Sequence, residues 1–280
     1  MSPTADDVPT VTQFTDPMCT WCWGAEPIVR HLRVAYGDRV RFEFVMGGLV
    51  ADFEAFYDAR NDISTPADVI PHWEEAAAVH GMPMDTTVLA EDPPDSTHPA
   101  NVAVAAARLQ DRVLAHRYLR RLREAYTTER VNVATREAQL DLAAAVGLDV
   151  EAFRTALEDG SARAAFERDQ RRLREAGVRS FPTYRLTGPD GTRQAAGFQS
   201  FDALSELLTS VAPGLESASP PPVAEFVAAY GPVATQEVAE VYELSRGKAH
   251  QTLASLHEAG AVAVDERPDC RFWIAPDGAD

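Results

Sequence analysis

The sequence predicts an α/β fold that is interrupted by a long helical insertion and followed by a small C-terminal domain. Three observations support this prediction. Residues 8–50 show strand, helix and strand patterns in turn, residues 51–176 have helical spacing of apolar side chains, and residues 177–212 return to strand patterns before a last helix. At 280 residues the chain is long enough for more than one domain.

The first region contains two predicted strands and one predicted helix. Val8–Phe14 has the composition of a buried strand, and apolar residues recur at helical spacing over Trp23–Tyr36. Val40–Val45 alternates apolar and polar side chains as a half-buried strand does, and Gly47 and Gly48 end it. The chain therefore begins with a strand–helix–strand unit.

The next region is predicted to be almost entirely helical. Gly147 and Gly160 lie at plausible helix ends, and Gly81–Pro99, which contains four prolines, is predicted to be a loop. The predicted helices are Ala100–Leu109, His116–Tyr126, Thr135–Val146 and Val150–Leu157. Beyond them, Pro182–Leu186 and Arg193–Ala196 are predicted strands joined by the turn Gly188–Gly191, and Phe201–Val211 is a predicted helix.

Two cysteines two residues apart, Cys19 and Cys22, lie between the first predicted strand and the first predicted helix. Thiol–disulfide exchange needs such a pair. Unpaired N–H groups at a helix start favour the first thiolate, and a second thiol one turn later resolves the mixed disulfide. We therefore predict Cys19 as the nucleophile and Cys22 as the resolving thiol.

A half zinc site and a structural pair of thiols are the alternatives to redox chemistry. Structural zinc takes four protein ligands, and no second Cys or His pair follows this one. The third cysteine, Cys270, is far along the chain and is expected to be a lone thiol, inert or redox-responsive. We expect neither a metal nor a cofactor.

Three motifs resemble the DsbA-like thioredoxin family, in particular its cytoplasmic FrnE-type branch. They are Asp16–Gly24 (DPMCTWCWG), Ser96–Ala100 (STHPA) and Gly177–Thr183 (GVRSFPT), in the family's order. The resemblance covers residues 8–212. It implies a thioredoxin fold with a helical insertion and a disulfide oxidoreductase activity.

The resemblance also implies a substrate-binding surface around the dithiol. Pro182 is expected to be the cis-proline that faces the two cysteines, and the backbone of Phe181 is expected to pair with an extended substrate peptide. Trp21 is assigned to a hydrophobic rim for the substrate. Thr20 stands where many relatives have proline, so the residues between the thiols leave the redox direction open. Kappa-class glutathione transferases share the fold and the insertion, but they generally lack the paired cysteines.

Three polar residues near these motifs have simpler structural interpretations. Asp16, followed by a proline, is expected to cap a helix start rather than to relay protons. Glu26 is expected to be a solvated surface acid, although it could assist deprotonation of Cys22. His98 is expected to be part of a helix start.

The charge of the chain restricts its partners. The net charge is −17, and Lys248 is the single lysine among 26 basic residues. Such a surface repels nucleic acid and anionic membranes, and it suggests a salt-adapted (halophilic) protein. The N-terminal residues do not resemble a secretory signal, and no apolar run is long enough to span a bilayer. We therefore expect a cytoplasmic protein.

The C-terminal part is predicted to be a separate domain, residues 223–280, joined by a proline-rich linker, residues 213–222. The thioredoxin-like domain then comprises residues 8–50 and 177–212, and the insertion residues 51–176. The C-terminal pattern is three helices (Ala224–Tyr230, Thr235–Tyr242, Arg246–Ala259) and two strands (Ala261–Asp265, Arg271–Ile274), which resembles a winged helix.

Charge also decides what this C-terminal domain is expected to bind. Residues 220–280 contain four Lys or Arg against ten Asp or Glu, so docking of a protein or homodimerisation is favoured over DNA binding. Arg246 and Lys248 on the predicted recognition helix keep DNA as an alternative. Two hypotheses follow: a thiol–disulfide oxidoreductase that acts on protein or small-thiol substrates, and a redox-sensing adaptor or transcription regulator.

Overall fold

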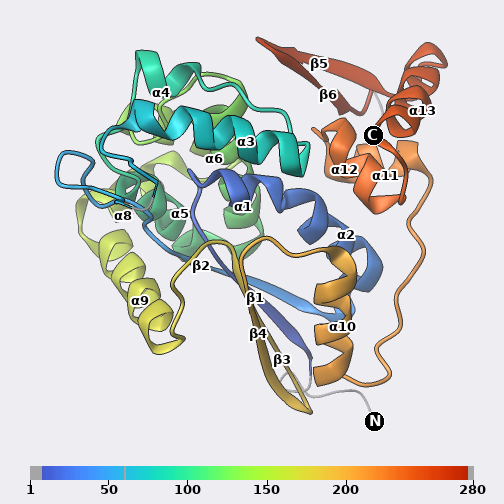
Figure 1. Ribbon diagram of the computed structural model, residues 1–280, viewed down its shortest axis with the longest axis horizontal. Helices are drawn as coiled ribbons and strands as arrows, with labels where there is room; N and C mark the ends of the chain where they lie inside the picture. The colour runs from blue at the N-terminus through green and yellow to red at the C-terminus, as the bar shows by residue number, and fades with distance from the viewer. Residues whose placement is uncertain (1–7, 60, 277–280) are drawn as a thin grey trace.

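The computed structural model describes residues 8–59 and 61–276, and a four-stranded sheet lies at its centre (Figure 1). The strands are β1 (Thr10–Thr15), β2 (Arg41–Met46), β3 (Thr183–Gly188) and β4 (Gly191–Ala196), in the order β2-β1-β3-β4. β1 runs parallel to β2 and antiparallel to β3. The last residue of β1, Thr15, pairs with Met46 at the end of β2. The predicted α/β class is confirmed.

One face of the sheet is covered by α2 (Glu26–Tyr36) and α10 (Phe201–Val211), whose apolar side chains pack on β1 and β3. The prediction of one continuous helix over Trp23–Tyr36 is wrong. A short helix, α1 (Thr20–Gly24), ends at Ala25 before α2 begins. The reason is Pro27, which has no N–H to donate to the carbonyl of Trp23.

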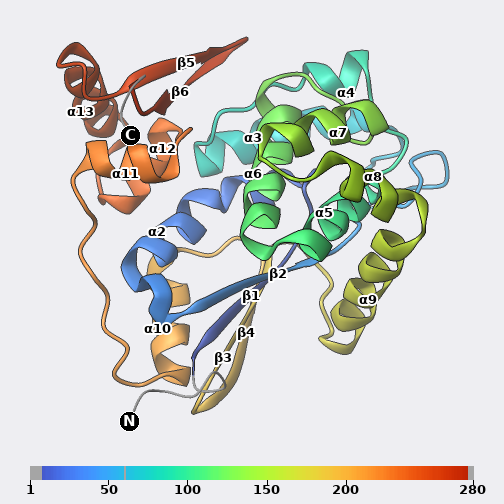
Figure 2. The same cartoon turned by 180° about the vertical axis from the view of Figure 1, so that it is seen from behind.

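The helices of the insertion pack around β2, at the edge of the sheet (Figure 2). They enclose the largest apolar cluster, into which Phe44 and Met46 of β2 project. The bounds are α3 (Ile70–His80), α4 (Thr87–Glu91), α5 (His98–Gln110), α6 (Arg112–Thr128), α7 (Arg136–Ala145), α8 (Val150–Glu158) and α9 (Ser161–Glu175), with 3-10 turns at Gly37–Arg39 and Pro66–Val69. The short helix α4 lies inside Gly81–Pro99, where the sequence predicted only a loop.

The C-terminal residues form a compact unit beside α2 and α3 (Figure 1). It consists of α11 (Val223–Tyr230), α12 (Thr235–Val241), α13 (Arg246–Glu258) and the antiparallel hairpin of β5 (Ala263–Arg267) and β6 (Cys270–Ile274). An extra β-bridge joins Val233 to Trp273. Among the residues that the structure describes, no helix has the length and apolar character to cross a membrane.

Candidate active site

The two cysteines lie at the junction of β1 and α1. Cys19 immediately precedes α1, and Cys22 lies inside it. Cys19 is 6% exposed whereas Cys22 is fully buried, and both are free thiols. An incoming sulfur therefore meets Cys19 first.

The Phe181–Pro182 peptide bond is cis, the isomer that the resemblance implies, and it lies against Cys19. The Cys19 thiol contacts the carbonyl oxygen of Phe181, with an Sγ···O distance of 3.9 Å. Gly47, just after β2, makes room for the Phe181 ring, because a Cβ at that position would collide with it. The structure thus brings Cys19, Phe181 and Pro182 together from segments about 160 residues apart.

A buried arginine of the insertion lies next to the dithiol. The Nη2 of Arg123 donates to the hydroxyl of Thr15, and this hydroxyl is hydrogen-bonded to Cys22. Arg123 is 1% exposed, and its Nε has no hydrogen-bond partner among the described residues. The sequence analysis missed Arg123. A signal existed, because Arg123 shares one helical face with the apolar residues Leu119 and Tyr126.

The two thiols ionise as a coupled pair. Burial raises the pKa of Cys22, but the hydrogen bond from Cys19, the charge of Arg123 and the hydrogen bond from Thr15 outweigh burial and lower it. The pKa of Cys19 is raised well above its usual value, because its thiol is hydrogen-bonded to Cys22, is buried and faces the charge of Cys22. These contacts favour negative charge at Cys22, whereas the sequence pattern favoured a thiolate at Cys19.

Glu26 is not the solvated surface acid that the sequence predicted. Its side chain is 13% exposed and pairs with Arg123 and, at 3.4 Å, with Arg120. Burial raises its pKa, but the charges of Arg123, Arg120 and Arg30 outweigh burial and lower the pKa to about 2. Sequence reasoning missed this arrangement because all three arginines come from other turns or helices.

Asp16 is not a cap of α1 either, since no side chain caps that helix. Its carboxylate is fully buried and accepts hydrogen bonds from the N–H groups of Met18 and Leu49, both at 2.8 Å. It also accepts from the Asn101 amide at 2.7 Å and the Thr97 hydroxyl at 3.3 Å. Asp16 therefore connects the dithiol segment to the start of α5. This helix begins at His98, two residues before the predicted Ala100, and His98 is part of a helix start as expected.

An aromatic rim surrounds Cys19; we use this term for Trp21, Phe181 and Phe198. Trp21 is partly exposed and packs on Phe198, with ring centroids 5.7 Å apart, whereas Trp23 is fully buried. Phe198 is 37% exposed and was not singled out in the sequence. The rim offers apolar surface to a substrate that approaches Cys19.

His80 of α3 supports α1 from the other side, and the sequence analysis missed it as well. Its Nδ1 accepts from the N–H of Met82 at 3.1 Å, so the proton lies on Nε2, 3.4 Å from the Thr20 hydroxyl. Burial lowers the pKa of His80 to about 4. Gly24 is needed here, because a Cβ at that position would collide with the His80 ring.

A set of ion pairs connects the dithiol to the C-terminal unit. Arg120, which pairs with Glu26, also donates to both carboxylate oxygens of Glu237 in α12, at 3.0 and 2.8 Å. Glu237 is fully buried and pairs with Arg30 at 3.2 Å. The series Arg123–Glu26–Arg120–Glu237 therefore runs without a gap from Thr15 to α12.

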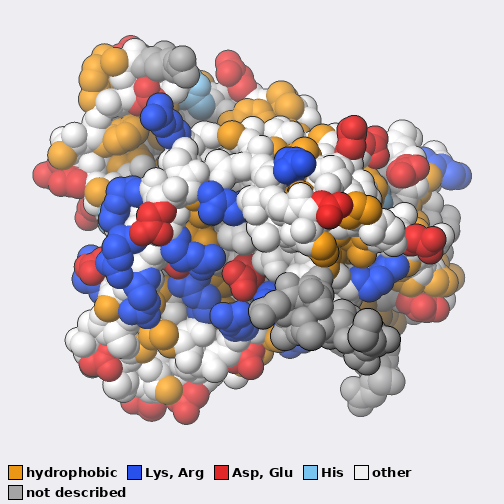
Figure 3. Space-filling model, turned by 90° about the horizontal axis from the view of Figure 1, so that it is seen from below, with side chains coloured by type: hydrophobic (Ala, Val, Ile, Leu, Met, Phe, Trp, Pro, Cys, Tyr) orange, Lys and Arg blue, Asp and Glu red, His pale blue; other side chains and the backbone are white. Residues whose placement is uncertain are grey.

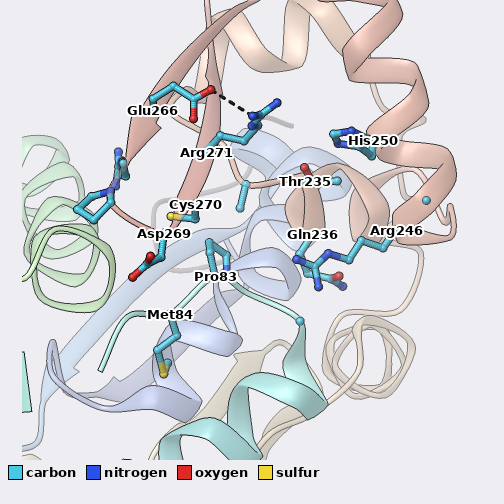
Figure 4. Close-up of a pocket in the computed structure, with 15 residues that line it drawn as sticks. Pro83, Met84, Thr235, Gln236, Arg246, His250, Glu266, Asp269, Cys270 and Arg271 are labelled. Atoms are coloured by element: carbon cyan, nitrogen blue, oxygen red, sulfur yellow. Dashed lines mark ion pairs between the residues drawn. The ribbon is translucent and has the colours of Figure 1, made fainter. Parts of the chain in front are cut away.

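A cavity of about 850 Å³ separates the C-terminal unit from the insertion (Figure 4). The start of α13, with Arg246 and His250, lines one side. Pro83 and Met84 line the opposite side, and they also contact α1: Trp23 donates to the Pro83 carbonyl at 2.8 Å, and the Thr20 hydroxyl lies 3.6 Å from the Met84 sulfur. Cys270 lies at this cavity, and burial raises its pKa to about 11.

Over residues 8–59 and 61–276, no three His, Cys, Asp or Glu side chains gather closely enough to hold an ion.

Comparison with known proteins places the chain in a family. A family model described as thioredoxin matches residues 13–203, more than half of the chain. The ClpXP adapter protein SpxH of Shouchella clausii is 31% identical over 267 residues, which are 93% of this chain and 86% of SpxH. SpxH of Bacillus subtilis is 29% identical and covers 94% of this chain. Matches that cover 93% and 94% of this chain are longer than residues 8–222, so they extend into the C-terminal unit.

A solved structure matches a smaller share of the chain. The cytosolic disulfide reductase DsbM of Pseudomonas aeruginosa, in a structure with glutathione, is 25% identical with a TM-score of 0.54. The match covers 72% of this chain and 93% of DsbM. The two kinds of match therefore differ in one respect: only the SpxH relatives, among these three, match along nearly the whole chain.

Proposed function

The chain belongs to the thioredoxin family and to the family of the SpxH relatives. We propose that it exchanges thiols and disulfides at Cys19 and Cys22. The observation that supports the proposal most is the contact between the Cys19 thiol and the carbonyl of Phe181, next to the cis peptide bond. In this geometry a sulfur at Cys19 is held beside backbone that an extended peptide can pair with.

The first step of the reaction uses the hydrogen bond between the two thiols. Cys19 attacks a substrate disulfide, and its proton passes to the thiolate of Cys22. The S–S bond of the substrate breaks. One half leaves as a thiolate that takes a proton from water, and the other half stays bound to Cys19 as a mixed disulfide.

In the second step the proton of Cys22 passes to water, and the Cys22 thiolate attacks the sulfur of Cys19. The second substrate thiol leaves, Cys19 and Cys22 form a disulfide, and two electrons have passed from the dithiol to the substrate. Arg123 assists this step, because its charge lowers the pKa of Cys22 and so favours the attacking thiolate. Two molecules of a small thiol such as glutathione restore the dithiol and leave as their own disulfide, and the reverse sequence oxidises a substrate dithiol.

We assign protein thiols and small thiols as the substrates, bound at Phe181, Pro182 and Trp21. The apolar rim around Cys19 supports a peptide substrate, and the glutathione in the DsbM structure supports a small thiol. The cytosolic designation of DsbM agrees with a reaction in the cytoplasm. The excess of acidic residues and the single lysine support a salt-rich cytoplasm.

Insulin reduction tests the exchange activity. Turnover should be lost in Cys19→Ser, whereas Cys22→Ser should accumulate a mixed disulfide that a non-reducing gel and mass spectrometry detect. Cys270→Ser is the matched control and should keep its turnover. Unchanged turnover in Cys19→Ser would refute the proposal.

A second candidate function is that of an adaptor, which the near full-length match to the ClpXP adapter protein SpxH favours. The C-terminal unit supports it. Its order of α11, the Val233 bridge, α12, α13 and the β5–β6 hairpin resembles that of a winged helix. The start of α13 lines the cavity in Figure 4 opposite Pro83 and Met84. Arg246 and Lys248 are exposed there, but the acidic excess of residues 220–280 favours a protein partner over DNA. Binding of a protein that depends on the redox state of Cys19 and Cys22, without insulin turnover, would favour the adaptor.

A further inference from the structure

A hollow on the insertion side of the sheet has the opposite charge to the protein as a whole. Figure 3 shows Arg side chains gathered over the insertion helices, on a chain whose net charge is −17. The hollow, which we call the β2 hollow, lies between β2, the end of α5, the start of α6 and α9. Its charged lining residues are Arg108, Arg112, Arg168, Arg172, Glu43 and Asp169.

The two acids of the β2 hollow do not balance its arginines. Asp169 is 2% exposed and is already bound, by Arg108 at 2.7 Å and by the N–H of Met46 at 2.9 Å. Glu43 is shared by Arg112 at 3.5 Å and Arg172 at 3.6 Å. Within the described part of the chain, Arg168 is in no ion pair. One solvent-facing carboxylate thus faces three exposed guanidinium groups, which leaves an excess of positive charge.

The floor of the β2 hollow is apolar. Phe42 and Phe44 of β2 line it together with Leu109, which is 48% exposed. The hollow has a volume of about 250 Å³, smaller than the ~300–1,000 Å³ that is typical of pockets for drug-sized ligands. This space suits one large apolar side chain.

The free edge of β2 is not available for pairing with another strand. The carbonyl of Phe44 accepts from Arg108 at 3.1 Å, and the carbonyl of Phe42 accepts a hydrogen bond from His116 at 3.2 Å. A ligand of the β2 hollow is therefore recognised through its side chains and not by strand addition.

We propose that the β2 hollow binds an acidic segment of a partner protein, which places one apolar side chain on Phe42 and Phe44 and its flanking carboxylates on Arg112, Arg168 and Arg172. Two N–H groups of a planar guanidinium can bind the two oxygens of one carboxylate. A short protein segment fits better than nucleic acid, because it contacts only the hollow, which admits one side chain, whereas a long polyanion also meets the acidic surface around it. This proposal does not rest on the redox function.

Fluorescence anisotropy with labelled peptides tests the proposal on the full-length protein. The probe is the peptide DEFED, compared with KKFKK and DESED, at the lowest KCl concentration that leaves the circular dichroism spectrum unchanged. We expect DEFED to bind, KKFKK not to bind, and DESED to bind at least fivefold more weakly. An oligonucleotide of the same charge should bind more weakly than DEFED.

Charge reversal locates the site. Arg168→Glu should weaken binding of DEFED at least fivefold, whereas Arg163→Glu, an exposed arginine of the same helix outside the hollow, should not. Insulin turnover should be equal in both variants, so the result is independent of the redox proposal. Absence of DEFED binding, an equal loss in Arg163→Glu, equal binding of DESED, or tighter binding of the oligonucleotide would each overturn the proposal.

Discussion

Two buried carboxylates flank the dithiol, and their pKa values move in opposite directions. Burial raises the pKa of Asp16, even though four hydrogen bonds from Met18, Leu49, Asn101 and Thr97 oppose it. The pKa of Glu26 falls to about 2, because the charges of Arg123, Arg120 and Arg30 outweigh its burial. Both acids lie within a few residues of the cysteines, so their place in the sequence does not explain the difference.

The difference lies in the partners. Asp16 is held by neutral donors from the backbone and from α5, which fix its position but do not compensate a full charge. Glu26 is held by cations, and it fixes Arg123 in turn. Asp16 therefore holds the chain around Cys19 in place. Glu26, together with the arginines that it pairs with, determines the charge near Cys22.

Replacing Arg123, the cation that Glu26 shares with the dithiol, should lower the stability of the protein more than any other change considered below. Arg123→Leu removes the buried cation beside Cys22 and one of the three cations that balance Glu26, which should cost about 3 kcal/mol or more of unfolding free energy. Urea denaturation followed by circular dichroism measures it. Arg121→Leu, on the same helix with its partner Glu129 near the surface, is the control and should cost about 1 kcal/mol or less.

Arg123→Lys keeps the charge but loses the two-pronged contact to Thr15 and Glu26. It should recover part of the stability and part of the lowered pKa of Cys22. Should Arg123→Leu unfold at the same urea concentration as Arg121→Leu, Arg123 would not be the group that compensates Glu26.

The second effect appears as a pH dependence. The folded pKa of Glu26, about 2, is below its unfolded value of 4.5, so its contribution to stability is present above pH 4.5 and is lost as the pH falls toward 2. The shift corresponds to about 3 kcal/mol. The raised pKa of Asp16 has the opposite sign, since protonation at low pH relieves its burial.

Glu26→Gln separates these contributions. The difference in unfolding free energy between the native protein and this variant should be largest near pH 5 and should shrink toward pH 2. His80, with its pKa lowered to about 4, loses stability from pH 6.5 downward in both proteins and therefore cancels in the difference. A difference that stays constant with pH would mean that Glu26 is not stabilised as an anion.

The sequence predicts the features that depend on neighbouring residues, such as single strands, single helices and the CxxC motif. Strand alternation and helical spacing found β1, β2 and α10, and the CxxC motif placed two sulfurs at a strand–helix junction. The Phe181–Pro182 segment came from a family resemblance, since periodicity says nothing of a peptide isomer. The break at Ala25 was missed although Pro27 signalled it, because the apolar spacing continues across it.

What could not be predicted depends on contacts between distant segments. Arg123 reaches Thr15 across 108 positions and Glu26 across 97, and a single sequence carries no signal for such pairs. His80 and Thr20 meet across 60 positions in the same way. The charges near a buried thiol therefore become known only from the fold. The thiolate was expected at Cys19 because the sequence shows the helix start there but does not show Arg123 near Cys22.

The smallest effect distinguishes the two acids through the thiols themselves. Asp16→Asn removes a negative charge that raises the pKa of Cys19, so Cys19 should react with iodoacetamide about two- to fivefold faster at pH 7. Glu26→Gln frees the charge of Arg123 and should instead lower the pKa of Cys22. Mass spectrometry of the alkylated peptides resolves the two cysteines. If both variants changed the reactivity of the same cysteine, the two carboxylates would act on the same thiol. The assignment of Asp16 to the surroundings of Cys19 and of Glu26 to the charge of Cys22 would then be wrong.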